Sequence, residues 1–150
     1  MADLDPKLFK KYDIRGRADG DNAPLDTAAA FAIGRAFGTY LFRVEGKRRV
    51  IVGRDNRNSS QSLKQALVEG LMASGCDVLS IGLASTPLVY WYAVREDGSL
   101  GGAAIDVLAH RRRQHDRLAG TGRSDAKGVA KGVERTKAAL DELPLAGAEH

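Results

Sequence analysis

The chain has one cysteine, Cys76, so it can form no internal disulfide, and a reducing compartment is favoured. It also lacks an apolar run approaching the roughly 20 residues of a membrane span, and its N-terminus has no apolar signal-peptide core. Neither sign of charge dominates, because the net charge is only +4. Bulk charge therefore does not indicate nucleic-acid binding. These absences predict a soluble, cytoplasmic protein that does not enter a membrane.

What is present is enough for one ordinary core, since 43% of the 150 residues are apolar. The stretch from Val50 to Ser60 organises the chain. Val50 to Val52 are β-branched and predict a short strand buried on both faces. Either Ser59 or Ser60 can cap a following helix over residues 61–74. In an α/β sheet the loop between them lies at the carboxyl edge of the strand, where ligands bind.

The rest of the N-terminal two thirds alternates short apolar runs with helical periodicity. A helix capped by Asp26 is expected over residues 26–42, with Gly34 and Gly38 allowing close approach of a neighbour. Its apolar stripe comprises Ile33, Phe37, Tyr40, Leu41 and Val44, and it is expected to pack on the sheet.

Further strands are expected near Tyr12, over 77–82 and from Ala103. Thr86-Pro87 opens a helix whose buried side is predicted to be Leu88, Trp91 and Tyr92. These aromatic residues favour packing over a stacking platform for bases. Cys76 is expected to be a small buried thiol between a helix and a strand.

Five landmarks occur in a characteristic order. They are Tyr12-Asp13-Ile14-Arg15-Gly16, then Val52 to Arg57 with Ser59-Ser60, then Gly75 to Val78, then Ile81-Gly82 with Thr86-Pro87, then Gly101-Gly102. Together they resemble the N-terminal domain of the phosphohexomutases, the phosphoglucomutase and phosphomannomutase family, over about residues 7–105. The resemblance implies a three-layer α/β/α domain with a mixed four-stranded sheet, the first of four domains. It also implies transfer of phosphate between the 1- and 6-positions of a hexose through a bisphosphate intermediate, using a phosphoserine and Mg²⁺.

The resemblance implies three substrate-facing or phosphate-facing residues: Tyr12, Arg15 and, less directly, Arg54. Arg15 would be a phosphate ligand, because a guanidinium group binds phosphate oxygens bidentately. From local sequence alone, an edge strand with solvated charges is favoured over a phosphate site for the segment around Tyr12.

The chain departs from the family where a Thr-x-Ser-His-Asn-Pro type sequence would carry the phosphoserine. No serine occurs between Ser99 and Ser124, so no catalytic residue is assigned. The family's acidic magnesium loop, sugar-reading loop and C-terminal phosphate loop would lie beyond residue 150. No metal ligand or cofactor is therefore assigned, and the chain is expected to be inactive alone.

Residues 106–150 are expected to form a divergent basic tail after the α/β domain of residues 1–105. Arg111, Arg112, Arg113 and Arg117 lie close together, and few large apolar residues follow them up to Gly132. This composition predicts a mobile segment, with a short helix near residues 133–143. His110 and His115 have no nearby thiolate, so a zinc site is not expected.

Three functions remain open from the sequence. The chain is an incomplete phosphohexomutase domain with weak affinity for a hexose phosphate, or a non-catalytic α/β module that binds a protein partner at its unfinished sheet edge. The third hypothesis is a nucleic-acid binder that uses the basic tail. Apart from Lys47-Arg48-Arg49, the α/β part has no basic cluster, which argues against the third.

Overall fold

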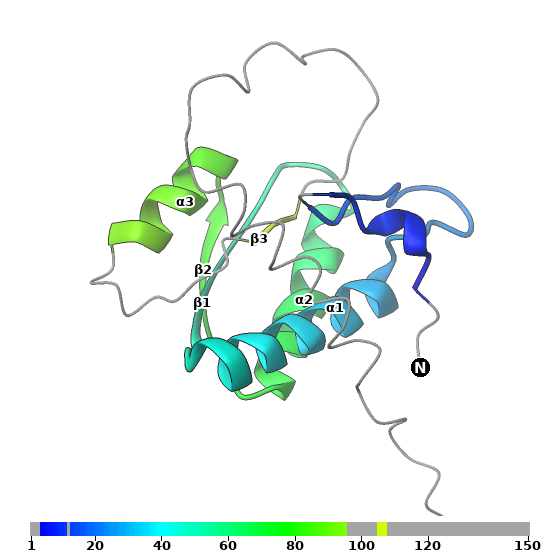
Figure 1. Ribbon diagram of the computed structural model, residues 1–150. Helices are drawn as coiled ribbons and strands as arrows, with labels where there is room; N and C mark the ends of the chain where they lie inside the picture. Colours follow the sequence, from blue (N-terminus) through cyan, green and yellow to red (C-terminus); the bar gives the residue numbers. More distant parts are fainter. Residues whose placement is uncertain (1–3, 12, 96–104, 108–150) are drawn as a thin grey trace, which may run out of the picture.

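The structure, a computed structural model, describes residues 4–11, 13–95 and 105–107 (Figure 1). The helical elements are η1 (Pro6–Leu8), α1 (Thr27–Tyr40), the π-helical turn η2 (Leu41–Glu45), α2 (Ser60–Ala73) and α3 (Thr86–Arg95). The strands are β1 (Arg49–Arg54), β2 (Asp77–Leu83) and β3 (Ile105–Val107). None of the helices in these ranges has the length and apolar character needed to span a membrane.

The three strands form a parallel sheet in the order β2-β1-β3. Val50 pairs with Val78 of β2, and Val52 pairs with Ile105 of β3, so β1 lies in the centre. Val50, Ile51 and Val52 are fully buried, which confirms the predicted central strand. β3 crosses the expected domain boundary at residue 105; the rest of the tail lies outside the described residues.

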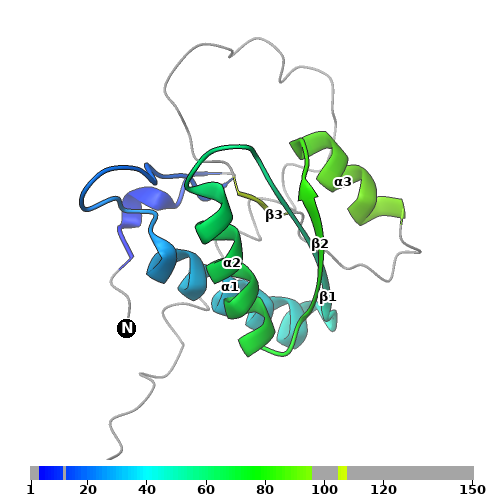
Figure 2. The same cartoon turned by 180° about the vertical axis from the view of Figure 1, so that it is seen from behind.

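Alternate side chains of β1 enter two separate cores, as the period of a strand requires. Val50 and Val52 join the core formed with α1 and α2, whereas Ile51 packs with Val89 of α3. Figures 1 and 2 show the same arrangement from opposite sides: α3 covers one face of the sheet, and α1 and α2 lie on the other. The described part of the chain is therefore a three-layer α/β/α domain.

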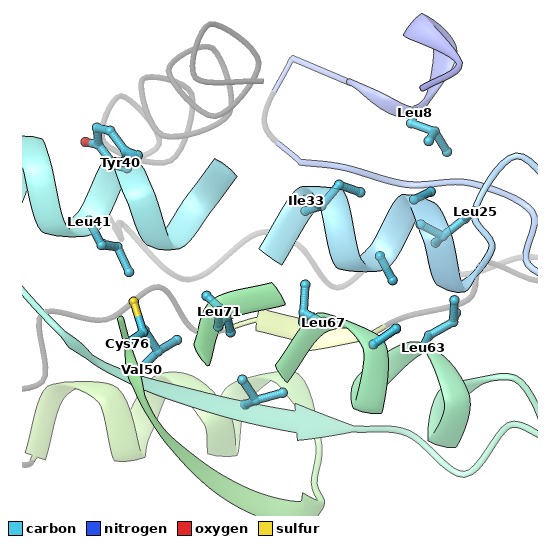
Figure 3. Close-up of a cluster of buried hydrophobic side chains, with 14 residues drawn as sticks. Leu8, Leu25, Ile33, Tyr40, Leu41, Val50, Leu63, Leu67, Leu71 and Cys76 are labelled. Carbon is cyan, nitrogen blue, oxygen red and sulfur yellow. The ribbon is translucent and has the colours of Figure 1, made fainter. Parts of the chain in front are cut away.

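The larger core lies between α1, α2 and β1. Leu63, Leu67 and Leu71 extend from α2 towards α1, and Cys76 lies between Leu41 and Val50 (Figure 3). Cys76 is buried, as predicted, with its Sγ 3.8 Å from the carbonyl oxygen of Gly38. Burial raises the pKa of this thiol, outweighing the hydrogen bond from Ser74, which lowers it. The core therefore favours the neutral thiol over the thiolate.

Helix α1 packs mainly along α2 and not directly on the sheet as expected. Gly34 lies against the backbone of Leu67 and Leu71, so a side chain at this position would overlap α2. The prediction that the glycines of this helix allow close approach is confirmed: α2 approaches Gly34, whereas Gly38 lies against the side chains of Ser74 and Cys76, just after α2. Asp26 is the N-cap, and its Oδ1 accepts a hydrogen bond from the Ala29 amide at 2.7 Å.

Two predicted apolar faces need correction. Helix α1 ends at Tyr40, and Val44, on the following π-helical turn, is 56% exposed, so it does not extend the buried stripe.

On α3, Val89 is fully buried and Tyr92 packs beside it, whereas Leu88 and Trp91 are 42% and 49% exposed. Because α3 has only ten residues and its apolar side chains occupy neighbouring positions, the sequence pattern does not show which side of the helix is buried.

The predicted strand near Tyr12 is not confirmed in the described residues, and Tyr12 itself lies outside them. Phe9 and Ile14 form a single antiparallel bridge, and the amide of Lys10 donates to the carbonyl of Asp13. This segment folds back on itself within a few residues, which leaves no length for a ladder in the sheet. All pairings found in the described sheet are parallel and join three strands, so the mixed four-stranded sheet is not confirmed.

Candidate functional site

The carboxyl edge of the parallel sheet is the place where α/β proteins bind ligands. Arg54 ends the central strand there, paired in register with Leu83 of β2 and Val107 of β3. Its carbonyl oxygen also accepts a hydrogen bond from the Ala84 amide at 3.0 Å, in the connection between β2 and α3. The backbone of Arg54 is thus fixed from both neighbouring strands.

The loop from Asp55 to Ser59, between β1 and α2, is organised by Asp55. Its Oδ1 accepts hydrogen bonds from the Arg57 amide at 3.2 Å and from the hydroxyl of Ser60, and its Oδ2 lies 3.1 Å from Nε of Arg57. Ser60 is the first residue of α2 and is fully buried. One carboxylate therefore ties the loop to the first turn of the helix.

The serines do not cap α2 as predicted. Ser59 is the N-cap residue, but its side chain makes no capping hydrogen bond, and the hydroxyl of Ser60 donates to Asp55 instead of accepting from a backbone amide. The Asp55 network was missed by sequence reasoning. The available signal was the spacing Asp55-Asn56-Arg57, which repeats the Asp13-Ile14-Arg15 spacing nearer the N-terminus.

Arg54 and Arg15 are both described, whereas Tyr12 is not. Nη1 of Arg54 donates to the carbonyl oxygen of Asp55 at 3.0 Å. Nε of Arg15 lies 2.5 Å from Oδ2 of Asp13, and the side chain of Arg15 is 48% exposed. In both Figures 1 and 2 the N-terminal segment lies at the same end of the molecule as the β1–α2 loop. Within the described ranges, no hydrogen bond or ion pair joins the two arginines.

A hollow of about 410 Å³ lies beside this loop, between residues 18–27 and the start of α2. Its polar lining includes Asn22, Asp26, Thr27, Ser59 and Ser62, and neither Arg15 nor Arg54 contributes to it. Among the residues described, no group of three or more His, Cys, Asp or Glu side chains could hold a metal ion.

Residues 6–110 match the family described as "Phosphoglucomutase/phosphomannomutase, alpha/beta/alpha domain I". The chain is 46% identical over 101 residues to the phosphoglucomutase/phosphomannomutase of Thermococcus kodakarensis, covering 66% of this chain and 21% of that protein. It is 47% identical over 101 residues to a phosphomannomutase of Escherichia coli, covering 67% of this chain and 20% of the relative.

A crystal structure of a phosphoglucomutase/phosphomannomutase family protein from Burkholderia thailandensis is also similar. The comparison gives a TM-score of 0.54 and 42% sequence identity. The matched region covers 60% of this chain and 19% of the Burkholderia thailandensis chain. The chain thus spans about a fifth of the length of these relatives. The match to domain I, over more than half of the chain, together with the three-layer fold shows that the chain belongs to the phosphoglucomutase/phosphomannomutase family.

Proposed function

We propose that this chain acts as the first domain of a phosphohexomutase, in which Arg15 and Arg54 face the phosphate of a hexose phosphate. The observation that carries the proposal is the place of Arg54, at the carboxyl end of the central strand between β2 and β3. Arg15 adds a half-exposed guanidinium group on the N-terminal segment, and this segment lies at the same end of the domain. Guanidinium groups suit phosphate because they donate two parallel hydrogen bonds.

We further propose that the chain does not interconvert hexose 1-phosphate and hexose 6-phosphate by itself. Phosphoryl transfer in this family needs a phosphoserine, and the sequence has no Ser-His-Asn-Pro. The described residues also form no cluster that fits Mg²⁺, so the family's metal is not assigned to this chain. Without a phosphoryl donor or a cation to neutralise developing charge, bound substrate would not react.

The proposed substrate class is a hexose phosphate, without a choice between glucose, mannose and glucosamine. The relatives carry different names: phosphomannomutase in Escherichia coli, phosphoglucomutase in Neisseria gonorrhoeae and probable phosphoglucosamine mutase in Pyrococcus abyssi. What their substrates share is the phosphate group, which is the part that arginine side chains recognise.

The test combines turnover and binding. Purified chain with Mg²⁺ and a hexose bisphosphate should give no glucose 6-phosphate from glucose 1-phosphate above a buffer control. In an NMR titration with glucose 6-phosphate, Arg15→Ala and Arg54→Ala should each weaken binding about tenfold, the usual scale for a lost charged hydrogen bond. Arg43→Ala, on the exposed turn η2, is the matched control and should bind like the unmodified chain. Turnover by the chain, or equal binding by all variants, would refute the proposal.

A second candidate function, binding of a protein partner, rests on the exposed side of β2 and α3. Leu79 and Leu83 of β2 are 41% and 62% exposed, and Leu88 and Trp91 of α3 are exposed nearby in sequence. β2 is an edge strand of the described sheet, and an apolar edge strand is a template for pairing. Sedimentation of the chain with a full-length phosphohexomutase should show a complex that Leu83→Lys weakens. If the two proteins sediment independently, binding of a protein partner is refuted, and the first candidate function is the one that remains.

A further inference from the structure

Two Asp-x-Arg segments of this chain form the same ion pair. In Asp13-Ile14-Arg15, Oδ2 of the aspartate lies 2.5 Å from Nε of the arginine. In Asp55-Asn56-Arg57, Oδ2 of the aspartate lies 3.1 Å from Nε of the arginine. Both segments lie at the end of the domain where the carboxyl edge of the sheet is found (Figures 1 and 2). Arg57 is therefore held in the same manner as Arg15.

An ion pair through Nε leaves the rest of an arginine fork available. Guanidinium has five N–H donors, and a contact at Nε uses only one of them. In the described part of the chain, the terminal nitrogens of Arg57 make no other ion pair or hydrogen bond, and its side chain is 37% exposed. Arg57 thus keeps a solvent-facing pair of donors suited to phosphate oxygens.

Arg54 and Arg57 are both held by the same residue. Arg54 donates to the carbonyl oxygen of Asp55, and Arg57 pairs with the carboxylate of Asp55. The Asp55 side chain is only 18% exposed, and its other oxygen accepts from the buried hydroxyl of Ser60 and from the Arg57 amide. Because the carboxylate is anchored to α2, the position of the Arg57 guanidinium is set by the helix rather than by a free side chain.

We propose that Arg57 is a further phosphate-binding residue of this domain and that Asp55 is its positioning residue. The inference rests on the proposed function, because it places a third cation at the same phosphate-facing edge as Arg15 and Arg54. The probe is inorganic phosphate, which tests the anion site without assuming a sugar.

Charge and positioning predict opposite results for Asp55→Asn. Removing a carboxylate makes the site more cationic, so charge alone would tighten phosphate binding. If Asp55 positions Arg57, the same variant frees the guanidinium group, and phosphate binding weakens. The sign of the change therefore separates the two explanations.

The experiment measures phosphate binding and the Arg57 Nε–H resonance by NMR on the full chain. We expect Arg57→Ala to weaken phosphate binding about tenfold. Asp55→Asn should weaken it several-fold and should broaden or shift the Nε–H resonance. Arg57→Lys keeps the charge but lacks Nε, so it should bind more weakly than the unmodified chain. Asp77→Asn, an exposed aspartate at the opposite end of the sheet, is the matched control and should change neither readout.

Each outcome decides the proposal. Unchanged phosphate binding by Arg57→Ala, absence of phosphate binding by the unmodified chain, or tighter binding by Asp55→Asn would overturn it. If Asp55→Asn does not fold, Ser60→Ala removes only the anchor to α2 and should produce the same loss in weaker form; an unchanged Ser60→Ala would then count against positioning. If Arg57→Ala weakens binding but Arg15→Ala and Arg54→Ala do not, the inference stands and the assignment of the latter two arginines fails.

Discussion

Gly70 of α2 lies directly against the carbonyl oxygen of Phe31 on α1, so that a Cβ at position 70 would overlap that oxygen. Gly34 has the reciprocal position, with its hydrogen facing the carbonyl oxygen of Leu67 on α2. The two helices therefore meet backbone to backbone at this crossing. No larger residue fits at either glycine unless the helices separate.

Gly70→Ala should destabilise the domain even though alanine is the better helix former. The clash is with backbone atoms, which cannot rotate away as a side chain can, so we expect a loss of about 2–3 kcal/mol in the free energy of unfolding. Urea denaturation followed by circular dichroism measures it. Met72→Ala, exposed on the same helix, is the control and should change stability by less than about 0.5 kcal/mol. A Gly70→Ala variant as stable as the unmodified chain would show that the helices do not cross as described.

Cys76 should make stability depend on pH in the alkaline range. Burial raises the pKa of the Cys76 thiol in the folded chain above the value of about 8.5 in the unfolded chain. The folded state therefore favours the neutral thiol, and this contribution is complete below pH about 8.5 and is lost as the pH rises through the higher folded pKa.

The free energy of unfolding of the unmodified chain should thus fall relative to that of Cys76→Ala as the pH is raised above about 8.5. Iodoacetamide labelling gives an independent check, because only the thiolate of an accessible cysteine reacts. Labelling should be slow in buffer and fast in urea. Parallel pH curves for the two proteins, with fast labelling in buffer, would contradict burial of Cys76.

The buried face of α3 can be identified by a pair of substitutions. Val89 is fully buried against Ile51, and Gly53 also lies against it, so Val89→Ala should cost about 1.5–2.5 kcal/mol in the free energy of unfolding. Leu88→Ala removes a larger side chain from a half-exposed position and should cost less. Thermal or urea denaturation compares them, and a greater loss for Leu88→Ala would restore the face predicted from the sequence.

Two substitutions of Asp26, the N-cap residue of α1, should affect the free energy of unfolding differently. Asp26→Ala removes the acceptor of the Ala29 amide and should cost about 1 kcal/mol, whereas Asp26→Asn keeps an oxygen acceptor and should retain most of the stability. Asp19→Ala, in the exposed loop before the helix, is the control. Equal losses for Asp26→Ala and Asp26→Asn would mean that charge rather than capping stabilises this end of the helix.

The sequence by itself determined the elements whose signal is local. Val50 to Val52 could be identified as a buried strand because three β-branched residues in succession leave no polar face. Asp26 could be identified as a cap, and residues 61–74 as a helix, because capping chemistry and a four-residue period act within one or two turns. The family was also recognisable, since its landmarks are short motifs in a fixed order.

Only the tertiary structure decided which surfaces meet. The sequence shows which residues of α3 are apolar, but it does not show which of them are buried. The contact with Ile51 identifies Val89, and not Leu88, as the fully buried residue. The glycines of α1 indicated close neighbours, and the folded chain shows that α2 lies against Gly34 and that Ser74 and Cys76 lie against Gly38. The pairing of Asp55 with Arg57 and Ser60 likewise depends on how the loop turns into α2, because a hydrogen bond requires atoms to lie within about 3 Å, and residue spacing alone does not set that distance.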